Sequence, residues 1–259
     1  MVEPLFRASL NSEVKAGESV AIGADEAKHA IAVRRMRVGE SIQLANGKGL
    51  RVRGVVEEIQ PGLLITKVQE VIHESEPICK LTLVQALAKG DRDELAIQAA
   101  AELGVWQVTP WQAERSISRW DGPKVAKGVA RWQAIVSEAT KQSLQAFEPV
   151  VAQPLESKAL AKGFADFDRV LILDPTSEVG LGSIDFAGQE RVALVVGPEG
   201  GISANELSLF EAAGAVRVRL GASILRTSTA GVVAISAIQT LLGFYGSQTL
   251  EIPVTRLDS

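Results

Sequence analysis

One stretch of the sequence, residues 191–243, restricts the fold more than any other. It opens with the apolar run from Val192 to Val196, which is short enough for a β-strand buried on both faces. Gly-Pro-Glu-Gly-Gly follows at residues 197–201, and its three glycines let the backbone approach a neighbouring group without an intervening Cβ. A buried strand that ends in a glycine-rich turn indicates an α/β sheet with a binding site at its carboxyl edge.

The residues after this turn predict a helix and a further strand. Ser203 and Glu206 have the spacing of a capping box, so we expect a helix to begin there and to stop at Gly214. Residues 215–220 alternate apolar side chains with arginine, which is typical of a strand, and Gly221 ends it.

A second loop, residues 224–229, follows that strand and precedes a long apolar helix. It carries one arginine, Arg226, among the hydroxyls of Thr227, Ser228 and Thr229. With Glu199 of the glycine turn, these groups can bind a nucleoside-like ligand through main-chain donors and acceptors. The alternative is that Glu199 only caps the next helix and pairs with Arg226.

Strands and helices alternate through the second part of the chain. Strands are predicted at residues 80–86, 105–111 and 170–173, and helices are predicted to start at Asp91 with Glu94, and at Pro123. This order implies an α/β fold with a mostly parallel sheet and helices on both faces.

The first part of the chain has a different pattern of predicted strands and helices. Short apolar strands are predicted at residues 19–22, 41–45, 50–59 and 63–72, and one helix capped by Asp25 interrupts them. The polar stretch 73–77 reads as a linker. We therefore expect a small β-rich domain over residues 1–74 and an α/β domain over residues 75–259.

Three arginines, Arg34, Arg35 and Arg37, follow the predicted helix of the first domain. They can form a solvated face that interacts favourably with the helix dipole. They can equally form a patch that contacts the phosphates of a nucleic acid.

Composition excludes several classes of protein. A net charge of −4 argues against a positive potential over the whole surface, although a local basic patch stays possible. The one cysteine excludes an intrachain disulfide and suggests a reducing compartment. Neither a secretion signal nor a long charge-free apolar segment is visible, so we expect a cytoplasmic protein without a membrane partner.

Several common catalytic motifs are also missing from the sequence. The glycine turn lacks the Gly-Lys-Ser/Thr of a P-loop, and no strand is followed by a complete dinucleotide-binding or nucleophile-elbow motif. His29 and His73 lack matching ligand spacing, so no metal site is expected, and Cys79 reads as a small buried hydrophobic residue.

Motifs across nearly the whole chain resemble the SPOUT (trefoil-knotted) methyltransferases, and among them the ribosomal RNA small subunit methyltransferase E family. The order and spacing of these motifs together carry the resemblance. They are Phe6-Arg7, His29–Met36, Lys89–Arg92, Glu102–Val105, Glu114–Ser116, Glu138 with Gln142-Ser143, Leu194–Gly201 and Leu220–Ala230.

The resemblance implies a PUA-like RNA-binding β-barrel over residues 1–74 and a C-terminal trefoil-knotted parallel-sheet (SPOUT) domain over residues 75–259. It implies methylation of N3 of a specific uridine in 16S rRNA, with S-adenosylmethionine as cofactor and the assembled 30S particle as the expected substrate. A homodimer with active sites at the subunit interface is also implied.

The resemblance, together with the chemistry of methyl transfer, leads us to expect roles for individual residues. Arg226 is expected to stabilise charge on the uracil, while Arg7 and Arg115 hold the flipped base or its phosphate. The cofactor-binding residues are expected to be Leu173, Gly197, Pro198, Glu199, Gly200, Leu220, Gly221, Ile224, Leu225, Thr227, Thr229 and Ala230. The RNA-binding residues are expected to be Arg34, Arg35, Arg37, Lys89, Arg92 and Gln142.

The chain departs from the family pattern at two places. It has Ala222, Ser223 and Ser228 where Pro, Arg and Glu are common, and residues 144–147 are Leu-Gln-Ala-Phe where an arginine is usual. Two alternatives therefore stay open. One is a SPOUT methyltransferase acting on another RNA nucleotide, and the other is a non-catalytic RNA-binding assembly factor.

Overall fold

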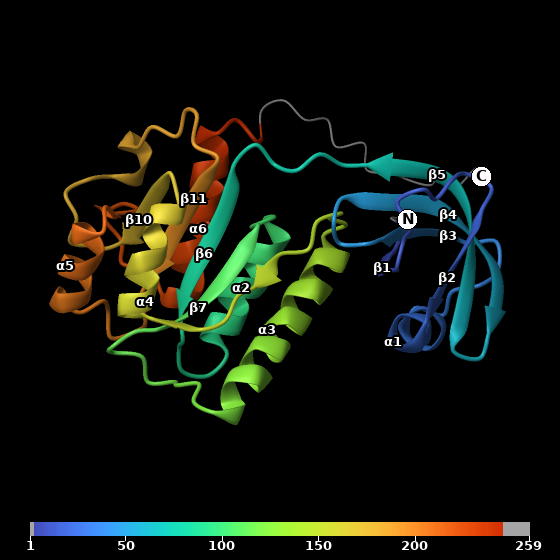
Figure 1. The fold of residues 1–259 in the computed structure, drawn as a ribbon, viewed down its shortest axis with the longest axis horizontal. Helices are drawn as coiled ribbons and strands as arrows, with labels where there is room; N and C mark the ends of the chain where they lie inside the picture. The colour runs from blue at the N-terminus through green and yellow to red at the C-terminus, as the bar shows by residue number, and fades with distance from the viewer. Residues whose placement is uncertain (1–2, 246–259) are drawn as a thin grey trace. The chain divides into compact units, whose positions relative to one another are not determined.

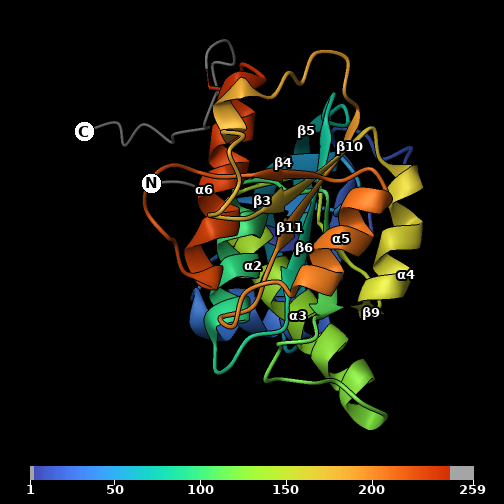
Figure 2. The ribbon, with the colours of Figure 1, turned by 90° about the vertical axis from the view of Figure 1, so that its left-hand side faces the viewer.

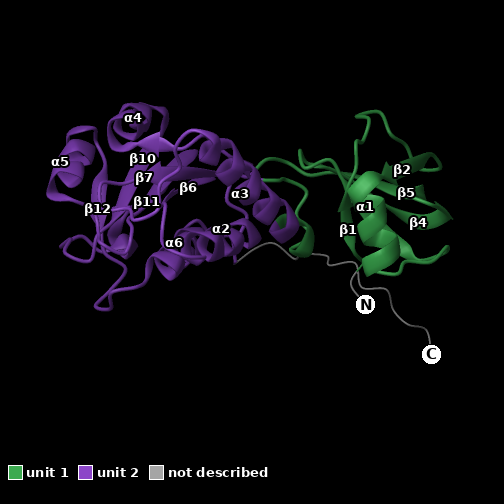
Figure 3. Cartoon of the chain, turned by 90° about the horizontal axis from the view of Figure 1, so that it is seen from below, with its two compact units in different colours: residues 1–76, 140–148, 249–259 green, residues 77–139, 149–248 purple. Residues whose placement is uncertain are grey.

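The computed structural model describes residues 3–245, which form two compact units (Figure 3). The described part of the first unit lies within Met1–Glu76 and Thr140–Glu148. That of the second lies within Pro77–Ala139 and Pro149–Gln248. The chain therefore returns to the first unit over residues 140–148, a return that a boundary near residue 74 does not include.

The first unit is built on a five-stranded sheet with the order β1-β3-β4-β5-β2 (Figure 1). Strand β1 runs parallel to β3, and the other neighbours are antiparallel. The four strands predicted from the sequence are confirmed. The strands are β1 (Leu5–Arg7), β2 (Ser19–Gly23), β3 (Ser41–Ala45), β4 (Leu50–Gln60) and β5 (Leu63–His73).

A short helix α1 (Ala24–Lys28) continues into a π-helical turn η1 (His29–Val33) in the first unit. The predicted cap by Asp25 is wrong, because Gly23 is the N-cap residue and no side chain caps the helix. Asp25 instead lies in the first turn, where a carboxylate interacts favourably with the helix dipole.

The second unit contains a seven-stranded sheet with the order β12-β10-β11-β6-β7-β8, and β9 pairs with β7. All of its pairings are parallel, which confirms the prediction of a parallel sheet. The strands are β6 (Lys80–Ala86), β7 (Gln107–Gln112), β8 (Val150–Val151), β9 (Leu155–Glu156), β10 (Arg169–Leu173), β11 (Arg191–Val196) and β12 (Val216–Val218).

Strand β11 lies inside this sheet, as its apolar sequence predicts. None of residues 192–196 is more than 3% exposed. Val192, Leu194 and Val196 face one hydrophobic core, whereas Ala193 and Val195 face a second core on the other side. The strand is therefore buried on both faces.

Helices cover both faces of the sheet (Figure 2). Helices α2 (Arg92–Glu102), α3 (Pro123–Gln142) and α6 (Thr227–Leu241) pack on the side of Val192. Helices α4 (Ser157–Lys162) and α5 (Ala204–Ala212) pack on the other, and the short 3-10 turns are η2 (Gly163–Asp166) and η3 (Leu181–Ser183). No helix within residues 3–245 is long and apolar enough to span a bilayer.

The predicted capping box at the start of α5 is confirmed. The Ser203 hydroxyl accepts the Glu206 N–H at 3.1 Å, and the Glu206 carboxylate accepts the Ser203 N–H at 3.0 Å. Glu206 is only 2% exposed and also accepts bonds from the Glu114 N–H and the Ser157 hydroxyl. One carboxylate thus joins the start of α5 to the loop after β7 and to the start of α4.

Helix α2 begins where the sequence predicts. Asp91 is its N-cap residue, but the Asp91 side chain makes no capping bond. The buried Asp93 carboxylate instead accepts the N–H groups of Ala88 and Glu94 at 3.0 and 2.9 Å. Burial raises the pKa of the Asp93 carboxyl above its ordinary value. Asp93 therefore fixes the loop that leads into α2.

We predict that Glu206→Gln destabilises the protein by about 1–3 kcal/mol, because an amide nitrogen then faces buried donors that the carboxylate satisfied. Urea denaturation measures the change in the free energy of unfolding. Ser208→Ala, at an exposed position of the same helix, is the control and should change it by less than about 0.5 kcal/mol. Equal effects of the two changes would contradict the bridging role of Glu206.

Candidate active site

The parallel sheet of the second unit brings five loops to one edge. They follow the carboxyl ends of neighbouring strands, where ligands bind in open α/β sheets. These are residues 87–91 after β6, 113–122 after β7, 174–180 after β10, 197–203 after β11 and 219–226 after β12.

The glycine turn packs tightly against its own chain and against the loop after β7. A Cβ on Gly197 would lie 2.6 Å from the Cγ1 of Ile202, and one on Gly200 would lie 3.1 Å from the Cβ of Arg115. Arg115 Nη1 donates to the Gly200 carbonyl at 3.1 Å. The turn therefore needs glycine for close packing, and the structure brings it together with one predicted site arginine.

Glu199 of this turn is paired with the loop after β6. Its Oε1 accepts the Lys89 N–H at 3.1 Å and Arg92 Nη1 at 2.9 Å. Burial opposes ionisation, but these two bonds and the residue's own N–H outweigh it and lower the pKa of the Glu199 carboxyl. The alternative in which Glu199 caps α5 and pairs with Arg226 is wrong, because Ser203 caps α5 and Arg92 is the partner of Glu199.

A single hydroxyl joins the glycine turn to the loop before α6. Thr227 is 7% exposed, and its Oγ1 donates to the Gly197 carbonyl at 2.8 Å. The same Oγ1 accepts Nε2 of Gln85 at 2.9 Å. The sequence reasoning missed Gln85, whose only signal is a long polar side chain in an otherwise apolar strand.

Arg226 stands at the N-cap of α6 with its side chain exposed. Its carbonyl accepts the N–H groups of Thr229 and Ala230. Its guanidinium has no ion-pair partner within residues 3–245. Ile224 beside it is 81% exposed. This loop thus presents a cation and an apolar side chain to solvent.

Three other predicted pocket residues are anchored in the core. Leu173, Leu220 and Leu225 are half-buried and pack against the hydrophobic core shared by α2, α3 and α6. Gly221, in contrast, has φ of +142°, a conformation that side chains rarely adopt, and no atom lies within 4 Å of the place of its Cβ. The backbone at Gly221 is therefore open to a ligand.

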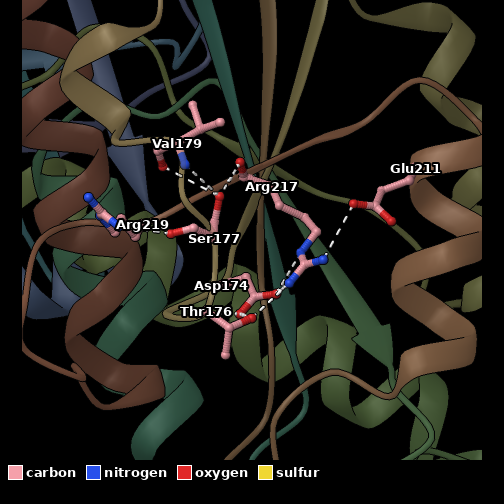
Figure 4. A network of polar contacts seen from close by, with 7 residues as sticks. All are labelled: Asp174, Thr176, Ser177, Val179, Glu211, Arg217 and Arg219. Carbon is pink, nitrogen blue, oxygen red and sulfur yellow. Dashed lines mark hydrogen bonds and ion pairs between the residues drawn. The ribbon is translucent and has the colours of Figure 1, made fainter.

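The loop after β10 is fixed to β12 by a polar network (Figure 4). Asp174 Oδ1 accepts the N–H and hydroxyl of Thr176, and its Oδ2 accepts Nε of Arg217 at 2.7 Å. Burial opposes ionisation of Asp174, but the bonds from Thr176 and Arg217 outweigh it and lower the pKa of the Asp174 carboxyl. Arg217 therefore serves the framework of the site and not a ligand.

The remaining predicted residues lie in the first unit. Arg7 is largely buried there, and its Nε pairs with Glu148 Oε2 at 2.8 Å. Its Nη1 donates to the Gln145 carbonyl, and burial lowers the pKa of the Arg7 guanidinium. The exposed predicted RNA-binding residues of this unit are Arg34, Arg35, Arg37 and Gln142.

Carboxylates, histidines and the cysteine do not form a metal cluster in the described part of the chain. No group of three or more His, Cys, Asp or Glu side chains there is arranged to hold a metal ion. Cys79 is buried and unpaired with another cysteine, and burial raises the pKa of its thiol to about 11.

Comparison with known proteins identifies both parts of the chain. The family described as RNA methyltransferase domain matches residues 74–239, and the family described as RNA methyltransferase PUA domain matches residues 22–69. Ribosomal RNA small subunit methyltransferase E of Mycobacterium tuberculosis is 40% identical over 229 residues, which are 87% of each chain. The protein of the same name from Bacillus subtilis is 29% identical and covers 87% of this chain and 91% of its own.

Solved structures agree with these matches. Ribosomal RNA small subunit methyltransferase E of Neisseria gonorrhoeae, bound to S-adenosyl methionine, has a TM-score of 0.83 at 29% identity, covering 92% of this chain and 98% of its own. A Legionella pneumophila protein described as a methyltransferase, in complex with the cofactor SAM, has a TM-score of 0.84 at 29% identity and covers 93% and 98%. The chain belongs to the ribosomal RNA small subunit methyltransferase E family of RNA methyltransferases.

Proposed function

We propose that this chain transfers a methyl group from S-adenosylmethionine to N3 of one uridine in 16S rRNA, within the assembled 30S particle. The observation that carries the proposal is the loop at the start of α6. Its exposed Arg226 precedes Thr227, whose hydroxyl joins this loop to the glycine turn. The names of the relatives and the S-adenosyl methionine in two related structures support it.

The domain boundaries and the path of the chain form part of this proposal. The family matches over residues 22–69 and 74–239 support a PUA-like domain over 1–74 and a methyltransferase domain over 75–259. We infer a trefoil-knotted path for the second domain, supported by its all-parallel sheet and by the likeness to solved relatives.

The residues at the sheet edge fit a nucleoside cofactor. Gly221 leaves its backbone open, and Leu220 and Leu225 offer apolar surface next to it. When bound, S-adenosylmethionine supplies the sulfonium methyl group. We assign its binding to Leu173, Gly197, Pro198, Glu199, Gly200, Leu220, Gly221, Ile224, Leu225, Thr227, Thr229 and Ala230.

Arg226 stabilises the reacting base in this proposal. Uridine N3 carries a proton, and its lone pair attacks best after that proton has left, when negative charge spreads onto the uracil oxygens. The unpaired guanidinium of Arg226 is suited to hold this charge. We assign Glu199 to holding the loop at Lys89 and not to proton removal, because its carboxylate already accepts one bond from that loop and one from Arg92 at the start of α2.

The RNA is held by cations from both units. Arg34, Arg35 and Arg37 are exposed in the first unit and can contact phosphates, as can the exposed Arg115 in the second. Lys89 and Arg92 are two further cations, and the neutral amide of Gln142 can hydrogen-bond to the RNA. Arg7 acts indirectly, because its guanidinium orders the segment that contains Gln142 through Glu148.

A cytoplasmic homodimer completes the proposal. Exposed apolar side chains gather on and next to α6, which supports self-association through this face. They are Val233, Leu241, Phe244 and Tyr245, with exposed fractions between 40% and 61%.

The reaction and its substrate can be tested together. Unmodified 30S particles and naked 16S rRNA are incubated with the protein and S-adenosylmethionine that carries a labelled methyl, and the modified base is mapped. We expect label on uridine N3 in the particle. Label on another nucleotide would assign a different RNA target. If no RNA were labelled and S-adenosylmethionine failed to raise the melting temperature, the protein would be a non-catalytic assembly factor and not an enzyme.

We predict that Arg226→Ala lowers kcat by about 10²–10³-fold, since one charge-stabilising group is lost from the site. The Kd for S-adenosylmethionine, measured by isothermal titration calorimetry, should change by less than about threefold. Arg226→Lys keeps the charge and should be more active than the alanine variant. Full activity of Arg226→Ala would contradict the assignment of Arg226 to charge stabilisation.

We predict that Arg34→Ala with Arg35→Ala weakens RNA binding and reduces the slope of log K against log salt by about 1 for each lost phosphate contact. Filter binding of the RNA at several salt concentrations measures this slope. Lys15→Ala, an exposed lysine of the same unit, is the matched control. An unchanged slope in the double variant would show that these arginines do not contact phosphates and only form a solvated surface.

A further inference from the structure

Gln85 is a buried polar residue to which the proposed mechanism gives no role. It lies near the end of β6, beside Val196 of β11, and is 0% exposed. Its Nε2 donates to the Ala86 carbonyl at 3.1 Å and to Thr227 Oγ1 at 2.9 Å. Its Oε1 is buried and has no hydrogen-bond partner among the described residues.

The direction of these hydrogen bonds is fixed by their chemistry. The Ala86 carbonyl can only accept, so the amide must turn its NH₂ group towards it. Thr227 Oγ1 then accepts a hydrogen bond from Gln85 and donates one to the Gly197 carbonyl. A one-way chain of donors thus runs from β6 through the first residue of α6 to the first residue of the glycine turn.

This arrangement is costly if its only purpose is stability. Leaving a buried acceptor unpaired costs free energy, whereas apolar groups of similar shape in place of both partners can be nearly neutral. Methionine at position 85 with valine at 227 would fill similar space without polar atoms. The chain instead retains an amide and a hydroxyl that connect two loops of the site.

We propose that Gln85 is a positioning residue for cofactor binding, which rests on the proposed function. Through Thr227 it fixes the Gly197 carbonyl relative to the start of α6, and therefore the glycine turn relative to Arg226. Thr227 consequently contributes to the pocket through the backbone it holds, because its buried hydroxyl is already bonded on both sides.

The test compares Gln85→Met, Thr227→Val and the double variant with the wild type. We expect each single change to weaken the Kd for S-adenosylmethionine about tenfold. The double variant should be no weaker than the worse single one, because all three break the same chain. The melting temperature of the double variant should fall, because the Gly197 carbonyl loses its donor, so its loss of affinity is compared with that of a variant that also leaves a carbonyl without its donor.

Gln239→Met is the matched control. Gln239 is also a buried glutamine, but it lies near the C-terminal end of α6, away from Thr227, and donates to the Leu103 carbonyl. It should lower the melting temperature and leave the Kd within about twofold. Thr227→Ser keeps the hydroxyl and should bind the cofactor more tightly than Thr227→Val. This comparison remains informative if Gln85→Met does not fold.

The outcomes distinguish failure of the proposed function from failure of the positioning role. A wild type that does not bind S-adenosylmethionine overturns the proposed function. A wild type that binds it, with Gln85→Met and Thr227→Val binding equally well, overturns the positioning role alone. Fully additive losses in the double variant would also overturn it, because they would show that the two residues act independently.

Discussion

The edge of the parallel sheet at which the candidate site lies depends on the hydrogen bonds of the buried Glu206 carboxylate. This carboxylate belongs to the capping box of α5, and it also accepts hydrogen bonds from the N–H of Glu114 and the hydroxyl of Ser157. Both hydrogen bonds are partly buried, so the carboxylate satisfies donors that have limited access to water. Because Glu114 is fixed, the next residue, Arg115, reaches the glycine turn. The position of Arg115 in the candidate site thus depends on the capping box of helix α5.

Features that depend on neighbouring residues could be predicted from the sequence. The buried strand β11 was visible as an apolar run, and the cap of α5 as the spacing of Ser203 and Glu206. The predicted start of α2 at Asp91 is confirmed, whereas the predicted cap at Asp25 is wrong because Gly23, two residues earlier, is the N-cap of α1. At α2 the Asp91 side chain makes no capping bond, and the Asp93 carboxylate accepts the Ala88 N–H of the preceding loop.

Partners distant in the chain could not be predicted. Glu199 and Arg92 are 107 positions apart, and Gln85 and Thr227 are 142 positions apart. The sequence supplies each charge or amide but not the fold that brings them together. It therefore predicted a site around Glu199 and Arg226, but it did not identify Arg92 as the partner of Glu199. Gln85 was missed because a single polar residue in a strand has no periodicity that would mark it.

The return of residues 140–148 to the first unit has a consequence for how such proteins can evolve. Gly49 donates to the Ala146 carbonyl, and a Cβ on Gly49 would lie 2.5 Å from the Phe147 ring, so this segment closes part of the first unit. A gene fragment ending near residue 74 would lack it. Recombination that moved only residues 1–74 would therefore leave part of the first unit behind.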